Sequence, residues 1–204
     1  MEQAQRNQSI LAKYIPEPAV PLISDWIFHF NFKLKIRKPR QSRYGDYTQP
    51  KAGLNHLITI NRNMNKYAFL LTLVHEIAHL LTFERYGNKV KPHGAEWKNA
   101  FKELMRPVMR LDVFPEDVRL AIISYMKDPG ASSCSDENLL RILKKHDRDN
   151  GLVHLETLHI HAHFEYGGRI FVKGAKMRTR YQCKLRDSHH IYLFSGLADV
   201  KRIE

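Results

Sequence analysis

The sequence predicts an α+β protein in which short strands precede a long apolar helix and a second group of strands closes the chain. Residues 67–83 are apolar nearly all round, as in a helix buried within a core. Apolar and basic residues alternate over 32–37, which is typical of a half-exposed strand. After residue 152, short alternating runs separated by glycines predict a small antiparallel β module.

The elements of the first part follow in order along the chain. A helix is predicted at 20–30, with prolines near its first turn. Strands are predicted at 32–37, 43–48 and 57–60, with glycines and prolines between them. Asn63 or Asn65 can cap the long helix. Further helical patterns cover 97–105, 116–127 and 136–146.

The long helix carries the sequence His75-Glu76-Ile77-Ala78-His79. Residues four apart on a helix point about 40° apart, so both imidazoles reach the same side and can bind one Zn²⁺. The intervening Glu76 can take a proton from a water on that metal. The alternative is a pair of core histidines bonded to backbone carbonyls.

A catalytic zinc usually has a third protein ligand. His93 lies between Pro92 and Gly94, which favour a turn just before the helical pattern that begins at Trp97. A histidine at this turn can close the site. Glu96 and Glu103 are rival third ligands on spacing alone.

A family resemblance rests on these residues. The stretch from His75 to Leu81, then Tyr86-Gly87, then Pro92 to Lys98, resembles the SprT-like metallopeptidases, and the likeness covers about residues 11–110. It implies a hydrolase with a zincin-like domain, a small antiparallel or mixed sheet over the His-Glu-x-x-His helix. It also implies zinc held by His75, His79 and His93, with Glu76 as general base and Glu96 not a ligand.

We therefore predict three segments. Residues 1–130 form the SprT-like zincin domain, 131–150 a linker and helix, and 151–204 a small antiparallel β module. Many members of the family end in a zinc ribbon with paired cysteines. The module resembles such a ribbon without its cysteine set.

The two cysteines, Cys134 and Cys183, cannot form a Cys₄ zinc site. His159, His161 and His163 alternate along a predicted strand and would share one face. A second metal site with Cys183 is one interpretation of this row, and a polar strand face is the more common one.

The formal net charge of +12 makes nucleic acid a reasonable partner. We select as nucleic-acid candidates the basic residues Lys35, Arg37, Arg40, Arg178 and Arg180. The alternative is a solvated basic surface. The resemblance favours DNA, single-stranded or crosslinked to protein, because the family includes the eukaryotic DNA-dependent protease Spartan.

The expected activity is zinc-dependent peptide hydrolysis on DNA-associated or DNA-crosslinked proteins. Two alternatives remain: a nucleic-acid-binding protein on a zincin scaffold with weak or gated peptidase activity, and a protein whose zinc serves folding only. The N-terminus has no signal-peptide core, and the apolar run at 68–74 is too short to span a bilayer. We expect a cytoplasmic protein with no membrane partner.

Overall fold

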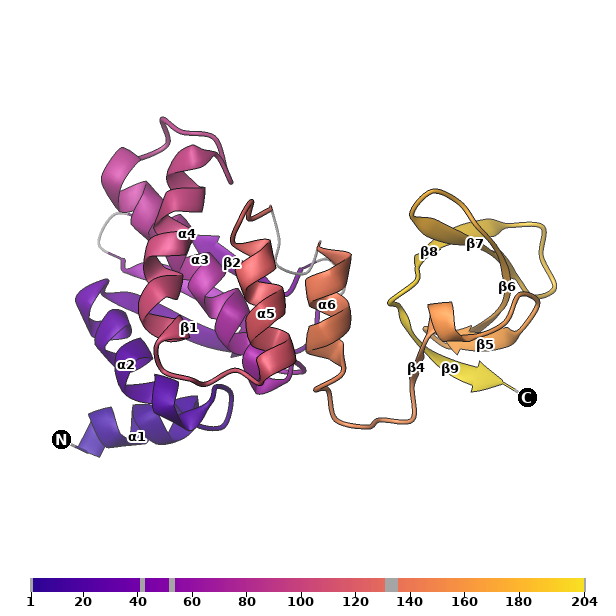
Figure 1. Cartoon of the computed structure of the whole chain (residues 1–204), viewed down its shortest axis with the longest axis horizontal. Helices are drawn as coiled ribbons and strands as arrows, with labels where there is room; N and C mark the ends of the chain where they lie inside the picture. The colour runs from indigo at the N-terminus through magenta and orange to yellow at the C-terminus, as the bar shows by residue number, and fades with distance from the viewer. Residues whose placement is uncertain (1, 41–42, 52–53, 131–135, 204) are drawn as a thin grey trace. The chain divides into compact units, whose positions relative to one another are not determined.

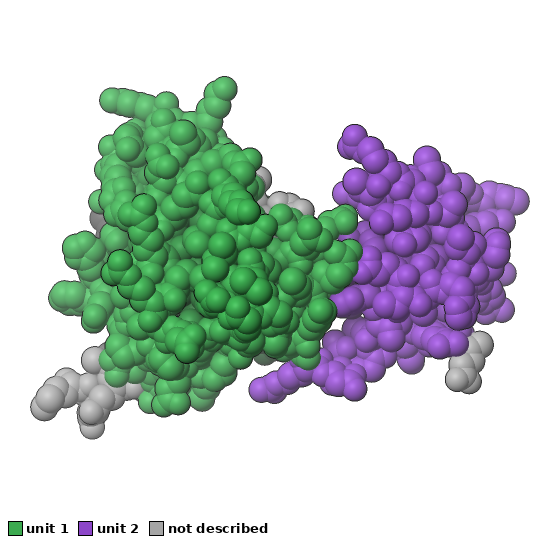
Figure 2. Space-filling model, viewed as in Figure 1, with its two compact units in different colours: residues 1–147 green, residues 148–204 purple. Residues whose placement is uncertain are grey.

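The chain folds into two compact units, residues 1–147 and 148–204 (Figure 2). The computed structural model describes residues 2–40, 43–51, 54–130 and 136–203. The first unit is mixed α and β, and the second is built almost entirely from strands (Figure 1). The predicted α+β class is confirmed at this level. No helix in the described part of the chain is long and apolar enough to cross a membrane.

Unit 1 contains six α-helices among its described residues. They are α1 (Glu2–Leu11), α2 (Val20–His29), α3 (Lys66–Tyr86), α4 (Ala95–Met109), α5 (Glu116–Tyr125) and α6 (Glu137–Lys144), with a 3₁₀ turn, η1 (Glu17–Ala19), before α2. Helix α3 packs along α4. Both predicted patterns, the long apolar one and the one that begins at Trp97, are therefore helices that touch each other.

The sheet of unit 1 has three strands in the order β1-β3-β2. They are β1 (Phe32–Arg37), β2 (Gly45–Thr48) and β3 (His56–Asn61). Strand β1 runs parallel to β3, and β2 runs antiparallel to it, so the sheet is mixed. Both β2 and β3 contact α3, which places the sheet against the helix that carries the histidines.

Helix α3 is buried around its whole circumference. Except for His79, every residue from Ala68 to Thr82 is buried. The apolar side chains of this stretch account for the burial, because each direction around the helix meets the sheet, α4 or another packed element. The polar side chains His75 and Glu76 are consequently carried into the core.

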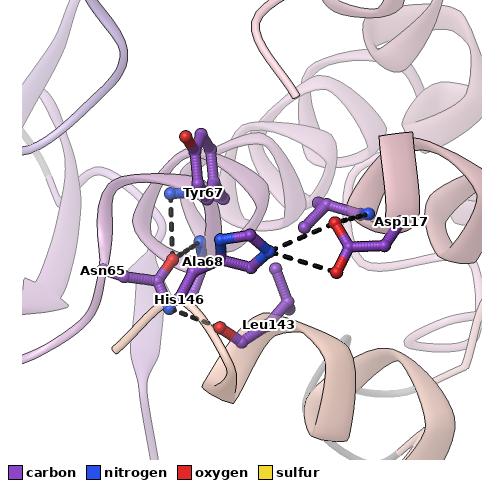
Figure 3. Close-up of polar contacts among 7 residues, drawn as sticks. Asn65, Tyr67, Ala68, Asp117, Leu143 and His146 are labelled. Atoms are coloured by element: carbon purple, nitrogen blue, oxygen red, sulfur yellow. Dashed lines mark hydrogen bonds and ion pairs between the residues drawn. The ribbon is translucent and has the colours of Figure 1, made fainter. Parts of the chain in front are cut away.

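Asn65 joins the start of α3 to the end of α6 (Figure 3). Its side-chain oxygen accepts hydrogen bonds from the N–H groups of Tyr67 and Ala68, at 3.1 and 2.9 Å. Its amide nitrogen donates to the Leu143 carbonyl at 2.8 Å and to the Asp147 carboxylate at 2.7 Å. One side chain thus satisfies helix ends on two elements far apart in the sequence.

The same end of α6 is also held to α5. The Nε2 atom of His146 lies 3.2 and 3.3 Å from the two carboxylate oxygens of Asp117 (Figure 3). Leu139 and Leu143 of α6 lie in the core of unit 1. These contacts place α6 in unit 1, and the division between the two compact units falls at 147/148.

Replacing Asn65 by alanine should lower the free energy of unfolding by about 1–3 kcal/mol, because the cap and the link to α6 are lost together. Urea unfolding of the full chain measures this. Asn63→Ala is the matched control, because Asn63 is exposed and is not the cap, and it should stay within about 0.5 kcal/mol of wild type. Equal losses in both variants would contradict the role of Asn65.

Unit 2 is a six-stranded antiparallel sheet that curls around a small core (Figure 1). The strands, in the order β4-β9-β5-β6-β7-β8, are β4 (Val153–His154), β5 (His163–Tyr166), β6 (Arg169–Lys176), β7 (Arg180–Leu185), β8 (Ile191–Ser195) and β9 (Asp199–Ile203). A 3₁₀ turn, η2 (Leu155–Thr157), follows β4. The β module is therefore present, with six strands and a core of its own.

A buried lysine holds this small core together. Lys173 is 3% exposed, and its ammonium donates to the carbonyls of Glu156 and Leu158 and lies 4.3 Å from the centre of the Tyr181 ring. Two carbonyls and one aromatic face surround the ammonium, so its donors are satisfied inside the core. The lysine fixes the η2 turn to β6 and β7.

The row of histidines predicted to share one strand face does not form. Strand β5 begins at His163, and His161 has a left-handed φ of 69° in the turn before it, so the period-two alternation is broken. Cys183 points into the core and is fully buried. No metal-binding cluster is found among the described residues of unit 2. Cys134 lies outside the described residues.

Candidate metal centre

Two elements bring three histidines together. His75 and His79 project from the same side of α3, one turn apart. His93 lies in the turn before α4, where the N–H of Gly94 donates to the Lys91 carbonyl at 3.0 Å. His93 has a left-handed φ of 58°, which is uncommon for a residue with a side chain. The strained backbone at this turn directs the imidazole toward the other two histidines.

The spacing of the three imidazoles fits a metal ion. The Nε2 atom of His75 lies 3.2 Å from that of His79 and 3.3 Å from that of His93. Two nitrogens bound at about 2.0–2.1 Å to a tetrahedral ion are about 3.3 Å apart. Among the described residues these three form the one group of possible ligands gathered this closely. A neutral Nε2 cannot donate to two neighbours at once, so a shared cation accounts for the convergence better than hydrogen bonds do.

The electrostatics of the site favour neutral imidazoles. Burial lowers the pKa of His75 to about 2, with His79 and His93 adding to the effect. Burial, with His93 beside it, lowers the pKa of His79 to about 4, and burial also lowers the pKa of His93. Metal ions bind the neutral form of histidine, so the site needs no deprotonation before it binds a cation at neutral pH.

Glu76 is buried between α3 and strand β2. Burial raises the pKa of its carboxyl to about 8, and the negative charge of Asp46 adds to this. A hydrogen bond from the Tyr47 backbone N–H and the charges of Arg40 and Arg43 act in the opposite direction. The carboxylate therefore takes and releases a proton near neutral pH, and a cation at the histidines would lower its pKa.

Gly45 makes room for this carboxylate. A Cβ atom on Gly45 would lie 2.6 Å from Oε1 and 2.9 Å from Cγ of Glu76, and 2.8 Å from Cγ2 of Thr72. No side chain fits at this position while Glu76 keeps its place. In the sequence, Gly45 appears only as a residue that separates strands. The need for glycine at this position becomes visible in the packing of β2 on α3.

Gly45→Ala should therefore destabilise the protein by about 1–3 kcal/mol through overpacking against Glu76. Adding Glu76→Ala to the same chain should recover part of the loss, because it removes two of the three close contacts. Urea unfolding of the two single variants and the double variant gives the coupling energy. Additive losses would show that Gly45 and Glu76 do not interact.

Trp97 forms the wall against which the three histidines pack. The indole is fully buried, and its ring centre lies 4.6 Å from that of His75, 5.4 Å from His79 and 4.8 Å from His93. Phe101, one helical turn along α4, stacks on the indole, with ring centres 5.3 Å apart and an interplanar angle of 16°. The helix that follows the third histidine thus supports all three.

The orientation of His75 depends on this packing. A metal-binding histidine usually donates its second ring N–H to an acceptor that fixes the plane of the ring. The Nδ1 atom of His75 is buried and has no hydrogen-bond partner among the described residues. Contact with Trp97 and the neighbouring rings therefore replaces the usual hydrogen bond for this histidine.

Trp97→Leu should weaken zinc binding by about 10- to 100-fold, since loss of the support around a ligand has effects of this size. Trp97→Phe keeps an aromatic plane and should lose less. Competition with a chelating dye measures the affinity, and circular dichroism checks that each variant folds. Trp26→Phe, at the other tryptophan of the chain, should bind zinc as wild type does. Wild-type affinity in a folded Trp97→Leu protein would refute the role of Trp97.

The rival third ligands do not join the histidines. Glu103 forms a bidentate ion pair with Arg85, at 2.7 and 2.8 Å, and Glu96 lies in the first turn of α4. Neither belongs to the group of residues that could hold one metal ion. His93 takes the position that the turn at Pro92 and Gly94 predicts.

The five nucleic-acid candidates are divided between the units. Lys35 and Arg37 lie on β1, and Arg40 follows in the loop, where its Nε donates to Asn61 at 2.9 Å. Arg178 and Arg180 are exposed at the hairpin between β6 and β7. Arg40 already has a partner in the fold, so it is the least available of the five for a phosphate.

Taken together, the fold and the site define an α+β domain with a three-histidine centre and a buried glutamate beside it. A model of the SprT-like family matches residues 23–118. This match supports the SprT-like assignment that the sequence motifs predict. No solved structure matches the chain.

Curated relatives named Protein SprT come from three bacteria. The protein of Pectobacterium carotovorum subsp. carotovorum (strain PC1) is 28% identical over 130 residues, which cover 54% of this chain and 76% of the relative. That of Pseudomonas fluorescens (strain SBW25) is 31% identical over 75 residues, 33% of this chain and 44% of the relative. That of Shewanella oneidensis is 49% identical over 43 residues, 21% of this chain and 27% of the relative. The matched segments cover less than half the length of the Pseudomonas and Shewanella proteins.

Proposed function

We propose that the chain is a zinc-dependent endopeptidase of SprT type with a zincin fold in unit 1. The observation that carries the proposal is the convergence of three imidazole nitrogens at metal-ligand spacing, with the carboxylate of Glu76 on the same helix. His75, His79 and His93 would hold the ion. A site that served folding alone would have no use for a buried carboxylate beside it.

The chemistry follows from the donor set. Bound zinc supplies a Lewis acid that makes water a nucleophile near neutral pH and polarises a carbonyl. Glu76 accepts the proton of the attacking water and later delivers it to the leaving amine. The hydrogen bond from the Tyr47 N–H holds the carboxylate in place. Strand β2 is an edge of its sheet, so an extended peptide can pair beside it.

The substrates that fit best are proteins on DNA or crosslinked to it. The formal net charge of +12 and the exposed arginines of the β6–β7 hairpin support an acidic polymer as partner. The alternative is a nucleic-acid-binding protein on a zincin scaffold with weak or gated peptidase activity. The basic residues would support either function, so activity must separate them.

Glu76→Gln should bind one zinc per chain and lose about 10²- to 10⁴-fold in casein cleavage, because the ligands remain while the base is removed. Cleavage by the wild-type chain is measured with zinc, with and without single-stranded DNA. Cleavage that needs both Glu76 and DNA supports the DNA-linked peptidase.

Cleavage without DNA leaves a peptidase whose basic surface has another purpose. Zinc bound at one per chain with no cleavage under either condition supports the nucleic-acid-binding alternative. Wild-type cleavage by Glu76→Gln contradicts the mechanism.

A further inference from the structure

Strand β8 forms an open edge of the unit 2 sheet. It is the last strand in the order and pairs only with β7 among the described strands. The Leu185 N–H donates to the His190 carbonyl at 3.0 Å, which fixes the alternation of the ladder. Tyr192 and Phe194 therefore direct their backbone groups at β7. Ile191 and Leu193 direct theirs away from the sheet.

This edge has none of the usual protection against pairing. The sequence of β8, Ile-Tyr-Leu-Phe-Ser, contains no charge and no proline. Ile191 is 62% exposed, Leu193 is 55% exposed and Tyr192 is 37% exposed. Free edges of soluble proteins are normally blunted by charged residues, prolines or bulges. An uncharged, exposed edge with apolar side chains on both faces is a template for another strand.

The surroundings of the edge are basic on both faces. On the outer face, Lys184 stands opposite Ile191 in the register, and Arg180 stands opposite Ser195. On the other face, the Arg169 guanidinium lies 5.9 Å from the centre of the Tyr192 ring. Cations therefore flank the apolar strip, and a strand added beside β8 would bring its side chains within their reach.

The outer face also offers a shallow pocket next to the strip. The pocket has a volume of about 270 Å³, and Val172, Lys184 and Ile191 contribute to its lining. Gly174 also lines it, and a Cβ atom there would lie 2.5 Å from the Gln182 carbonyl oxygen, so β6 and β7 approach each other closely only because this residue is glycine. An aliphatic side chain of an added strand can enter this pocket, and the next side chain along that strand points to the other face, toward Arg169.

We propose that β8 binds an extended peptide segment in which acidic residues alternate with aliphatic ones, by adding it as a further strand. Backbone N–H and C=O groups of Ile191 and Leu193 would pair with the segment. Its aliphatic side chains lie on the outer face and contact Leu193, Ile191 and the pocket, and its carboxylates lie on the other face, where they meet Arg169. A second copy of the chain fits poorly, because it would bring the same cations to the edge.

The exposed side chains of the strip favour a peptide over nucleic acid. Single-stranded nucleic acid binds where aromatic faces are free for stacking between cations. Ile191 and Leu193 are aliphatic, and the Tyr192 ring already contacts Phe171 and lies beneath Arg169. The proposal does not depend on peptidase activity, because no residue of the histidine site takes part.

The test uses the full chain and a fluorescent ten-residue peptide of alternating Glu and Val, with an alternating Lys and Val peptide as probe control. Fluorescence anisotropy should show binding of the Glu peptide alone. Leu193→Lys, which places a charge on the edge, should weaken binding at least about tenfold. Arg169→Glu should weaken it about two- to fivefold, the usual range for an exposed ion pair. Lys89→Glu changes the net charge equally on an exposed turn of unit 1 and should have no effect.

Amide hydrogen exchange locates the contact. Saturation with the Glu peptide should slow exchange of the Ile191 and Leu193 amides, which point away from β7, and leave Tyr192 unchanged. Failure of the Glu peptide to bind, or binding that survives Leu193→Lys with the module folded, overturns the proposal. Equal loss with Lys89→Glu also overturns it, since attraction would then depend on net charge. Tighter binding of a single-stranded oligonucleotide that Leu193→Lys abolishes assigns the edge to nucleic acid instead.

Discussion

The burial of polar side chains on α3 is the constraint on which the first unit depends. The helix has no solvent-facing side between Ala68 and Ala78, so His75 and Glu76 are enclosed with their polar atoms. Desolvation holds the imidazoles neutral and raises the pKa of the carboxyl. Trp97 packs against His75 on one side of the site. On the other side, Gly45 has no side chain and so leaves room for the carboxylate of Glu76. A metal ion would provide a shared partner for the three imidazole nitrogens, which point toward one another.

Periodicity and turn chemistry predict most of the elements of unit 1. Strand β1 has the predicted bounds, α3 follows the apolar run, and Asn65 is one of the two expected caps. The same patterns predict that α6 is a helix, but they do not predict where it packs. Its attachment depends on Leu139, Leu143 and the side chain of Asn65, which meet only in the folded chain. Local patterns identify helices, but they do not identify the core to which a helix belongs.

The histidine centre, too, is predicted only in part by local sequence patterns, and the rest depends on tertiary packing. Spacing places His75 and His79 on one side of a helix, and the turn at Pro92 and Gly94 predicts the approach of His93. Spacing gives no information on Gly45, thirty-one residues before Glu76 in the sequence and in contact with it in space. The row of histidines near His161 shows the opposite error, because a regular alternation there is interrupted by a left-handed turn.

The two units contribute different kinds of recognition. Unit 1 has a buried polar centre beside an edge strand, and unit 2 has an exposed apolar edge between cations. Because both lie on one chain, a segment held at β8 would have a raised effective concentration at unit 1 if it is long enough to reach that unit. A peptidase that captures an acidic, extended stretch at one place can cleave weakly bound sequences at another. In this module the hydrogen bonds of Lys173 join the η2 turn to the core without the metal of a zinc ribbon. The exposed side chains of β8 would then provide the binding surface.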